Sequence, residues 1–543
     1  MIAQSVREQL QSIVGPKWFK DDTETLVSYS YDATPLYQAM PDGVVFPAST
    51  EEVSEVMKVC AGHKIPVIAR GAGSNLCAGV VPVQGGIVMV MTRMNRLIEI
   101  DQDNLTATFQ TGLNTKQFHT AVEATGLFYP PDPSSMIICT MGGNIALGAG
   151  GLRGLKYGTT KDYVIGLEAV MANGDILRTG GKLVKDVAGY DLTRLLVGSG
   201  GTLAIITEAT VKLVPKPDFR RSMVAIYSDL QSAARSVSQI VANRITPCTL
   251  EFMDRATIRV VEDFARIGLP VDAEAILAIE QDGDESMVER DLQRIEELCR
   301  KEGAIQVKVA ATPEEGAKVM EARRSALAAL SRLRPTTILE DATVPRSRIA
   351  DMVMEVQRIA AKYDVQICTF GHAGDGNLHP TAMTDARNAE EIHRVEKAFE
   401  EIFEAAISMG GTITGEHGVG MVKAPYLEWK VGASGIDIMK RLKLAFDPDQ
   451  LLNPGKLFAE TRKRIVLTDG PGGREGEGRS EAREAGQLRA NEQERQTESE
   501  LESKQDRQGQ QDQQDQQEHS LQSAEETQQR VRRAGTGSEE GLS

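Results

Sequence analysis

The feature that most constrains the fold of this chain is a short glycine-rich loop after an apolar run. The loop consists of Arg70, Gly71, Ala72, Gly73, Ser74, Asn75 and Leu76. The apolar run 65–69 before it predicts a buried strand. Small residues let the backbone turn sharply and direct successive N–H groups at one point, which suits a phosphate or pyrophosphate. The Rossmann fingerprint is excluded because Leu76 stands where its third glycine would be, and an ordinary tight turn stays open as the alternative.

The composition excludes several classes of function. A length of 543 residues suggests more than one domain. The formal net charge of −16 argues against a general affinity for nucleic acid or anionic membranes. No signal peptide and no apolar run long enough to span a bilayer is expected. The six cysteines lie scattered without a C-x-x-C pair, which argues against a cysteine-held iron–sulfur cluster and fits a cytoplasmic setting.

Local signals divide the chain. Ser49, with Glu52 three residues later, forms a capping box that predicts the start of a helix. The β-type runs on either side of an Asn-Gly turn predict a hairpin over 164–177. Two prolines near residue 217 indicate a domain boundary. The predicted parts are a helical lead-in over 1–39, a ligand-binding domain over 40–217, a second domain over 218–458 and a low-complexity tail over 459–543.

A second unusual segment runs over residues 130–151 and is rich in Gly, Ala, Pro and Ser. Hardly any of its side chains could fill a core, as expected where backbone lies against a ligand. A flexible linker is the alternative, but Met141, Ile145 and Leu147 are too apolar for one.

The motifs of this first part, in their order, resemble the FAD-binding domain of the vanillyl-alcohol-oxidase superfamily. They are R-G-A-G-S-N-L (70–76), P-D-P-S-S (131–135), M-G-G-N (141–144), Y-G-T-T-K-D (157–162), G-Y-D-L (189–192) and G-S-G-G-T-L-A-I-I-T (198–207). The resemblance implies a two-subdomain domain with the FAD pyrophosphate on the first loop. It also implies non-covalent FAD, because that loop offers no histidine. The implied FAD contacts are Arg70, Gly71, Ala72, Gly73, Ser74, Asn75, Asp132, Ser135, Met141, Gly142, Gly143, Asn144, Gly201 and Ile206.

The second domain alternates strand-like and helix-like runs, which predicts an α+β fold with helices on one face of a sheet. Two glycine-framed motifs, over 370–379 and 415–420, hold three of the seven histidines. A tight turn between His372 and His379 can bring their rings together. Two imidazoles and a carboxylate suit a divalent metal such as Zn²⁺ or Mn²⁺, and histidines with structural roles only are the alternative.

Two further features complete the pattern. Arg323 lies on a predicted helix over 313–330, and an arginine fork matches the two oxygens of a substrate carboxylate. A solvated basic helix face is the alternative there. The motif F-D-P-D-Q-L-L-N-P-G-K over 446–456 is typical of a chain end that folds back onto a site.

Together these motifs are similar to the FAD-linked D-2-hydroxyacid dehydrogenases, most of all to the D-subunit group of the glycolate oxidases, over residues 40–458. The implied roles are metal ligation by His372, His379 and Glu416, proton abstraction by His417, carboxylate binding by Arg323 and a place beside the flavin for Asn453. Met320 replaces a tryptophan of many relatives. Leu339 replaces a lysine found in relatives that act on 2-hydroxyglutarate, which favours a monocarboxylate substrate.

The expected activity is oxidation of glycolate or D-lactate to the 2-oxo acid. Because the sequence has no cysteine cluster, electrons are expected to leave for a quinone, a separate iron–sulfur subunit, an electron-transfer flavoprotein or oxygen. The resemblance favours a partner complex, in which an iron–sulfur subunit works with a second flavin-binding subunit. Attachment to a membrane would then come through partner subunits. A non-catalytic FAD-binding subunit and, more distantly, a zinc hydrolase are the rivals. The tail over 459–543 has almost no apolar residues and is predicted to be disordered.

Overall fold

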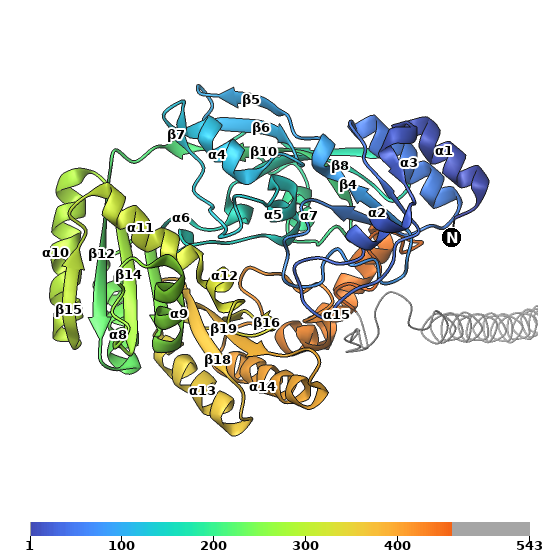
Figure 1. The fold of residues 1–543 in the computed structure, drawn as a ribbon. Helices are drawn as coiled ribbons and strands as arrows, with labels where there is room; N and C mark the ends of the chain where they lie inside the picture. The colour runs from blue at the N-terminus through green and yellow to red at the C-terminus, as the bar shows by residue number, and fades with distance from the viewer. Residues whose placement is uncertain (1, 459–543) are drawn as a thin grey trace, which may run out of the picture. The chain divides into compact units, whose positions relative to one another are not determined.

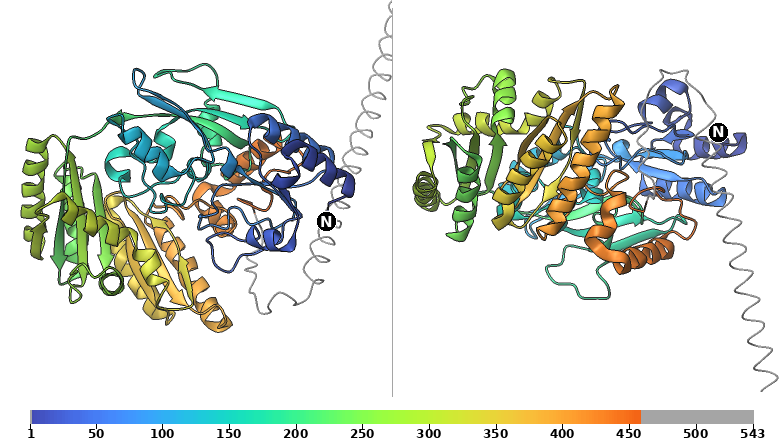
Figure 2. Two further views of the ribbon diagram at one scale, coloured as in Figure 1. Left: turned by 45° about the horizontal axis from the view of Figure 1, so that its top comes forward. Right: turned by 90° about the horizontal axis from the view of Figure 1, so that it is seen from below.

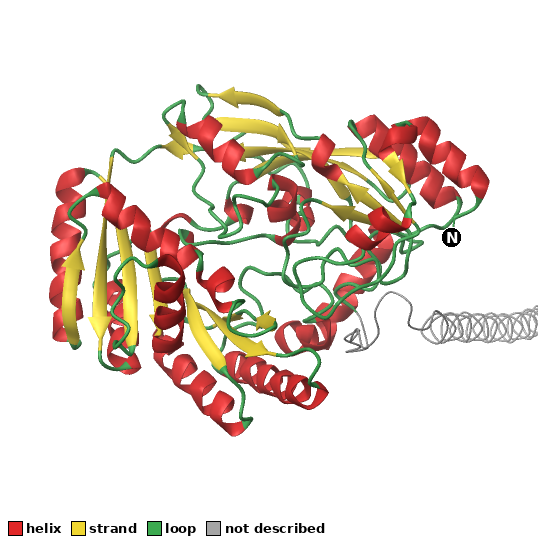
Figure 3. Cartoon of the chain, in the orientation of Figure 1, coloured by secondary structure: helices red, strands yellow, loops and turns green. Residues whose placement is uncertain are grey.

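The computed structural model describes residues 2–458, and the expectation for the tail over 459–543 lies outside the described residues. Helices and strands alternate along the chain, and most of the strands form three main sheets (Figures 1 and 3). Among the described residues, no helix combines the length and the apolar character needed to cross a membrane.

The first sheet has four strands in the order β1-β2-β4-β3. The strands and helices of this part of the chain are α1 (Gln4–Val14), β1 (Phe19–Lys20), α2 (Thr23–Ser28), β2 (Gly43–Val45), α3 (Thr50–Gly62), β3 (Val67–Arg70) and β4 (Ile87–Val90). Strands β2, β4 and β3 run parallel. The predicted cap of α3 is present, since Ser49 accepts a hydrogen bond from the N–H of Glu52. The lead-in is part of this unit, because Leu10 of α1 shares a core with Val56 of α3.

The second sheet is antiparallel, in the order β5-β6-β10-β8-β9. Its strands are β5 (Leu97–Asp101), β6 (Thr106–Gln110), β8 (Val164–Val170), β9 (Ile176–Gly180) and β10 (Ile205–Lys212). The helices of this part are α4 (Thr115–Glu123), α5 (Met141–Leu147), α6 (Gly154–Tyr157) and α7 (Leu192–Leu196), and β7 (Leu127–Phe128) pairs with β11 (Val214–Pro215). Strands β8 and β9 confirm the predicted hairpin.

The third sheet has the order β15-β12-β14-β13-β18-β19-β16, with the short β17 paired to β19. Its strands are β12 (Phe219–Tyr227), β13 (Thr249–Asp254), β14 (Ala275–Gly283), β15 (Ala304–Val309), β16 (Thr336–Leu339), β17 (Ala342–Thr343), β18 (Ile367–His372) and β19 (Asn377–Thr384). The helices that follow from residue 230 onward are α8 (Leu230–Ala242), α9 (Arg255–Ala265), α10 (Glu285–Lys301), α11 (Pro313–Arg324), α12 (Ala326–Leu330), α13 (Ile349–Lys362), α14 (Ala389–Ser408) and α15 (Leu427–Phe446).

The prediction that helices cover one face of this sheet is wrong. Along β14, Leu277 joins a core that includes α8, α10, α13 and α14, whereas the adjacent Ile276 joins a separate core with α9 and α12. The central strands are buried on both faces, which requires that each face has its own cover. The predicted helix over 313–330 is also divided, because α11 ends at Arg324 and α12 begins at Ala326.

The end of the second domain returns to the first sheet (Figure 2). The Asp447 carboxylate accepts hydrogen bonds from the N–H groups of Leu451 and Leu452, at 2.9 and 2.7 Å. Leu451 in turn accepts a bond from the N–H of Val67 in β3, and Asn453 donates one to the Val67 carbonyl, both at 2.8 Å. The second domain therefore reaches back to the strand that leads into the glycine-rich loop.

Candidate active site

The glycine-rich loop begins where β3 ends, at Arg70. A Cβ at Gly71 would clash with the Thr140 hydroxyl, and Gly73 has a φ of +72° with its missing Cβ against the Arg70 guanidinium. Within residues 2–458, none of the backbone N–H groups of residues 72–76 donates a hydrogen bond to the chain. A turn whose amides lack partners fits an anion, and this supports the expected pyrophosphate site.

The segment over 130–151 is more structured than a linker. Met141 and Ile145 are fully buried, so the expectation that hardly any side chain here fills a core is wrong for them. The N–H groups of Met141 and Gly142 donate to the carbonyls of Leu113 and Thr111, at 2.9 and 2.8 Å. The next two residues, 143 and 144, donate to Thr140. The start of α5 is thus a packed turn whose amides are already used, and any contact with a cofactor must involve its other atoms.

Asp132 connects the two domains. Its carboxylate accepts a hydrogen bond from the Arg324 guanidinium of α11 at 2.9 Å and forms an ion pair with Arg153 at 3.6 Å. Burial by itself would raise the pKa of Asp132, but the two arginines outweigh it and lower that pKa. Asp132 was expected beside the cofactor, and in the structure its contacts are these arginines. Ser135 lies in a neighbouring turn, where its carbonyl accepts from Ile138.

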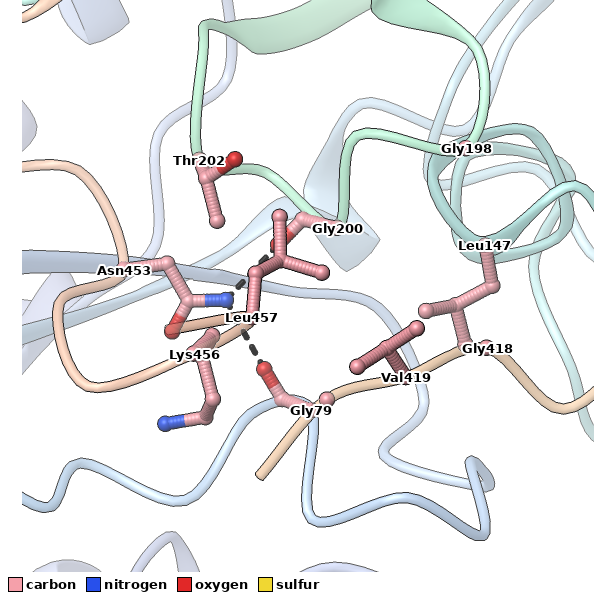
Figure 4. Close-up of a pocket in the computed structure, with 11 residues that line it drawn as sticks. Gly79, Leu147, Gly198, Gly200, Thr202, Gly418, Val419, Asn453, Lys456 and Leu457 are labelled. Atoms are coloured by element: carbon pink, nitrogen blue, oxygen red, sulfur yellow. Dashed lines mark hydrogen bonds between the residues drawn. The ribbon is translucent and has the colours of Figure 1, made fainter. Parts of the chain in front are cut away.

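Asn453 joins two glycine turns beside a pocket (Figure 4). Its Nδ2 donates to the carbonyls of Gly79 and Gly200, at 2.8 and 2.7 Å. Its buried Oδ1 has no partner within residues 2–458. The pocket lining also includes Gly418, which directly follows His417. The pocket is therefore built from turns of the first domain, the histidine loop of the second domain and the segment 453–457. Ile206, by contrast, packs into the core of the second sheet.

The turn between β18 and β19 brings His372 and His379 together, with ring centroids 5.0 Å apart. Glu416 completes the cluster from the loop before α15. Its Oε1 lies 3.1 Å from His372 Nε2 and 3.2 Å from His379 Nε2. One ligand atom from each residue lies within 4.8 Å of the others. Two imidazoles and a carboxylate at this spacing could hold a divalent cation of borderline character.

The charges of this cluster are mutually stabilised. Burial by itself would lower the pKa of His372, but Glu251 and Glu416 outweigh it and raise that pKa well above its usual range. For Glu416, burial opposes ionisation, but His372 and His379 hold the pKa well below its usual range. The cluster therefore keeps an anionic carboxylate in a buried position.

His417 lies against this cluster. Its ring stacks on His379 at a centroid distance of 5.1 Å and an interplanar angle of 9°. Its Nε2 lies 4.0 Å from Glu416 Oε1, and its Nδ1 has no hydrogen-bond partner among the described residues. Burial lowers the pKa of His417 to about 4, although the Asp341 carboxylate opposes the shift. The imidazole is thus neutral at pH 7 and can accept a proton.

Arg323 reaches the same place from α11. Only 1% of it is exposed, which excludes a solvated helix face. Its guanidinium lies 4.6 Å from the ring centroid of Phe370 and forms an ion pair with Glu251 at 2.7 Å. Its Nε has no hydrogen-bond partner within residues 2–458. A buried guanidinium with a free donor is suited to hold a carboxylate.

Two side chains that contact the candidate site were not predicted from the sequence. Glu251 of β13 contacts both Arg323 and His372. Asp341 Oδ2 accepts hydrogen bonds from the N–H groups of residues 415, 416 and 417, each at 2.9 Å, and from the Thr414 hydroxyl at 2.8 Å. A carboxylate within an apolar strand, as in T-L-E-F-M-D over 249–254, is the signal that could have revealed Glu251.

Comparison with known proteins gives the family. Residues 41–180 match the model described as FAD binding domain, and residues 216–457 match FAD linked oxidases, C-terminal domain. The chain is 60% identical over 467 residues to glycolate oxidase subunit GlcD of Bacillus subtilis, covering 86% of this chain and 99% of that protein. It is 34% identical over 455 residues to a D-lactate dehydrogenase of Anaerostipes hadrus, covering 82% and 95%.

Among solved structures, p-cresol methylhydroxylase with bound substrate has the same fold, with a TM-score of 0.72 at 18% identity, covering 86% of this chain and 99% of that one. Both the two-domain fold and the family predicted from the motifs are confirmed. The chain belongs to the FAD-linked oxidases, in the family that includes the glycolate oxidase GlcD proteins and the D-lactate dehydrogenases.

Proposed function

We propose that this chain oxidises a small 2-hydroxy acid, glycolate or D-lactate, to the 2-oxo acid. The observation that carries the proposal is the convergence of a neutral imidazole, a buried guanidinium and a three-residue donor cluster, next to a loop that lines a glycine-built pocket. The names of the relatives agree with it, since they are a glycolate oxidase subunit and a D-lactate dehydrogenase.

The substrate carboxylate binds Arg323. The Nε of this side chain has no hydrogen-bond partner within residues 2–458, which leaves a donor of the guanidinium for an anion while the group lies over the Phe370 ring. His417 takes the proton of the substrate hydroxyl, because its ring is neutral and its Nδ1 is free within the described residues. Asp341 fixes the backbone that carries this imidazole. Bound FAD supplies the acceptor for the hydride that leaves C2.

His372, His379 and Glu416 would hold a divalent metal, Zn²⁺ or Mn²⁺. Such an ion makes a hydroxyl more acidic and adds positive charge beside the substrate oxygens. The three side chains are already turned toward one another, so little rearrangement is needed to form the site.

A monocarboxylate is the proposed substrate class. Leu339 is buried in an apolar core, and so offers no second cation for a longer diacid. Lys423 is another cation near this loop, but it lies 3.5 Å from Glu340 and 3.8 Å from Asp341, so its charge is already matched.

Electrons must then leave the flavin. All six cysteines are buried and unpaired, so no thiolate cluster among the described residues could receive them. We propose transfer to a partner with its own redox centre, namely an iron–sulfur subunit with a second flavin-binding subunit, or to a quinone. The name of the Bacillus relative, a subunit, favours a partner protein.

Anaerobic titration of the purified protein with glycolate, D-lactate, L-lactate and D-2-hydroxyglutarate tests the proposal. Bleaching of the flavin band by glycolate or D-lactate, with no bleaching by 2-hydroxyglutarate, supports it. An unchanged band with every acid would favour the rival, a non-catalytic FAD-binding subunit. Oxygen uptake with glycolate under air then separates an oxidase from a dehydrogenase.

A further inference from the structure

Glu251 is a fully buried carboxylate in β13, between the apolar residues Leu250 and Phe252. Its two oxygens contact two different groups. Oε1 lies 2.7 Å from His372 Nδ1, and Oε2 lies 2.7 Å from an Arg323 terminal nitrogen. Burial of an anion is costly, so a carboxylate in such a place needs partners that offset the cost. Both partners belong to the candidate site.

We propose that Glu251 is a positioning residue that orients His372 toward a bound cation and cancels the charge of Arg323 beside it. This inference rests on the proposed function, because it assigns a role at the same site. It adds a residue that the sequence motifs do not single out.

The contact with His372 fixes the orientation of that ring. A carboxylate can only accept a hydrogen bond, so His372 presents its N–H at Nδ1 to Glu251. The other ring nitrogen, Nε2, faces Glu416 at 3.1 Å, and a bound cation would take its lone pair in place of the proton shared with that carboxylate. Histidines that bind metals depend on such an outer partner, and its loss typically weakens metal binding by about 10–100-fold.

The contact with Arg323 is an electrostatic requirement. Arg323 approaches the cluster closely enough that the Glu416 charge also stabilises its guanidinium. A divalent cation on His372, His379 and Glu416 would be repelled by an uncompensated guanidinium at this depth. Glu251 lies between Arg323 and the metal-ligand cluster, because its Oε2 contacts Arg323 and its Oε1 contacts His372. The same ion pair also holds the guanidinium in place over Phe370.

The experiment compares Zn²⁺ affinity in four forms of the FAD-loaded, full-length protein after removal of bound metal by a chelator. They are the wild type, Glu251→Gln, Glu280→Gln and the double variant Glu251→Gln/Arg323→Met. Glutamine keeps the shape of Glu251 and removes the charge. Glu280 is a matched control, because it is a buried carboxylate of the adjacent strand that accepts a hydrogen bond from Ser222 and pairs with Arg220, neither of which belongs to the candidate site. Flavin content and circular dichroism check that each variant is folded.

Glu251→Gln is expected to weaken Zn²⁺ binding by about 10–100-fold, with Glu280→Gln near wild type. The double variant is expected to recover part of the loss, because it removes the uncompensated positive charge. Equal affinity in Glu251→Gln and wild type, or an equal loss in Glu280→Gln, would overturn the positioning role. Absence of recovery in the double variant would overturn the charge-cancelling role. A wild type that binds no Zn²⁺ overturns the proposed metal site and this inference together, and that result is seen without any variant.

Discussion

Asp341→Asn should disrupt the loop that carries Glu416 and His417. The Asp341 side chain is fully buried, and one of its oxygens accepts four hydrogen bonds of 2.8–2.9 Å from the loop over 414–417. Asparagine keeps one acceptor oxygen and loses the charge. If about two of the four bonds are lost, at about 1.5 kcal/mol or more for each bond to a charged group, the cost is about 3 kcal/mol. Removal of one member of a buried ion pair gives a similar figure, about 3–5 kcal/mol, and Lys423 would lose part of its compensation.

The assay is urea unfolding of the FAD-loaded protein, followed by circular dichroism, together with the rate of flavin reduction by glycolate. Asp385→Asn is the control, because that carboxylate pairs with Arg387 at the surface, where such pairs contribute little. Asp341→Asn should lower the urea concentration at the midpoint of unfolding and slow the reduction of the flavin by glycolate, while the control should change neither. A stability within about 0.5 kcal/mol of wild type and unchanged reduction would refute the reasoning, since surface-like substitutions have effects of that size.

The same variant has a pH signature. Burial would raise the pKa of Asp341, but Lys423, His417 and His379 outweigh it and hold that pKa below its usual range. A depressed pKa contributes stability that is present above the unfolded value, about 4, and is lost as the pH falls through the folded value. Asp341→Asn should therefore flatten the acid limb of the stability profile. An acid limb identical to that of the wild type would contradict the assignment.

Three further predictions follow from the site and its supports. His417→Ala should retain FAD, with flavin reduction by glycolate slowed by about 10²-fold or more in stopped-flow traces; unchanged reduction would remove His417 from the mechanism. Arg323→Lys should raise KM for glycolate by about tenfold, because lysine lacks the fork, and a KM equal to wild type would place the carboxylate elsewhere. Gly142→Ala should destabilise the protein by about 1–3 kcal/mol in urea, because its Cβ would overlap Thr111, while Gly143→Ala should cost less; the reverse order would contradict the packing of α5.

Local chemistry made part of the site predictable. Gly376, with a φ of +91°, closes the turn between β18 and β19, so the approach of His372 and His379 follows from the residues between them. Contacts between distant segments were not predictable in this way. Glu251 lies 121 residues before His372, and no local period connects them. The contact between Asp132 and Arg324 likewise joins residues 192 positions apart.

The fold shows the same division. The hairpin of β8 and β9 and the cap of α3 at Ser49 depend on neighbouring residues, and both were predicted. The presence of helices on both faces of the third sheet was not predicted, because the spacing of apolar residues in a helix does not tell which face of a sheet that helix covers. The two-sided burial of β14 appears only when Leu277 and Ile276 are seen to enter different cores.

The central claim is that flavin bound by the first domain faces an acid-binding pocket of the second domain. Its most direct test is the visible spectrum of the purified, full-length protein, recorded without oxygen before and after addition of glycolate. A yellow protein whose flavin band bleaches on addition of the acid is the predicted result. A protein that stays colourless after incubation with FAD, or a flavin band that neither glycolate nor D-lactate alters, would contradict the account.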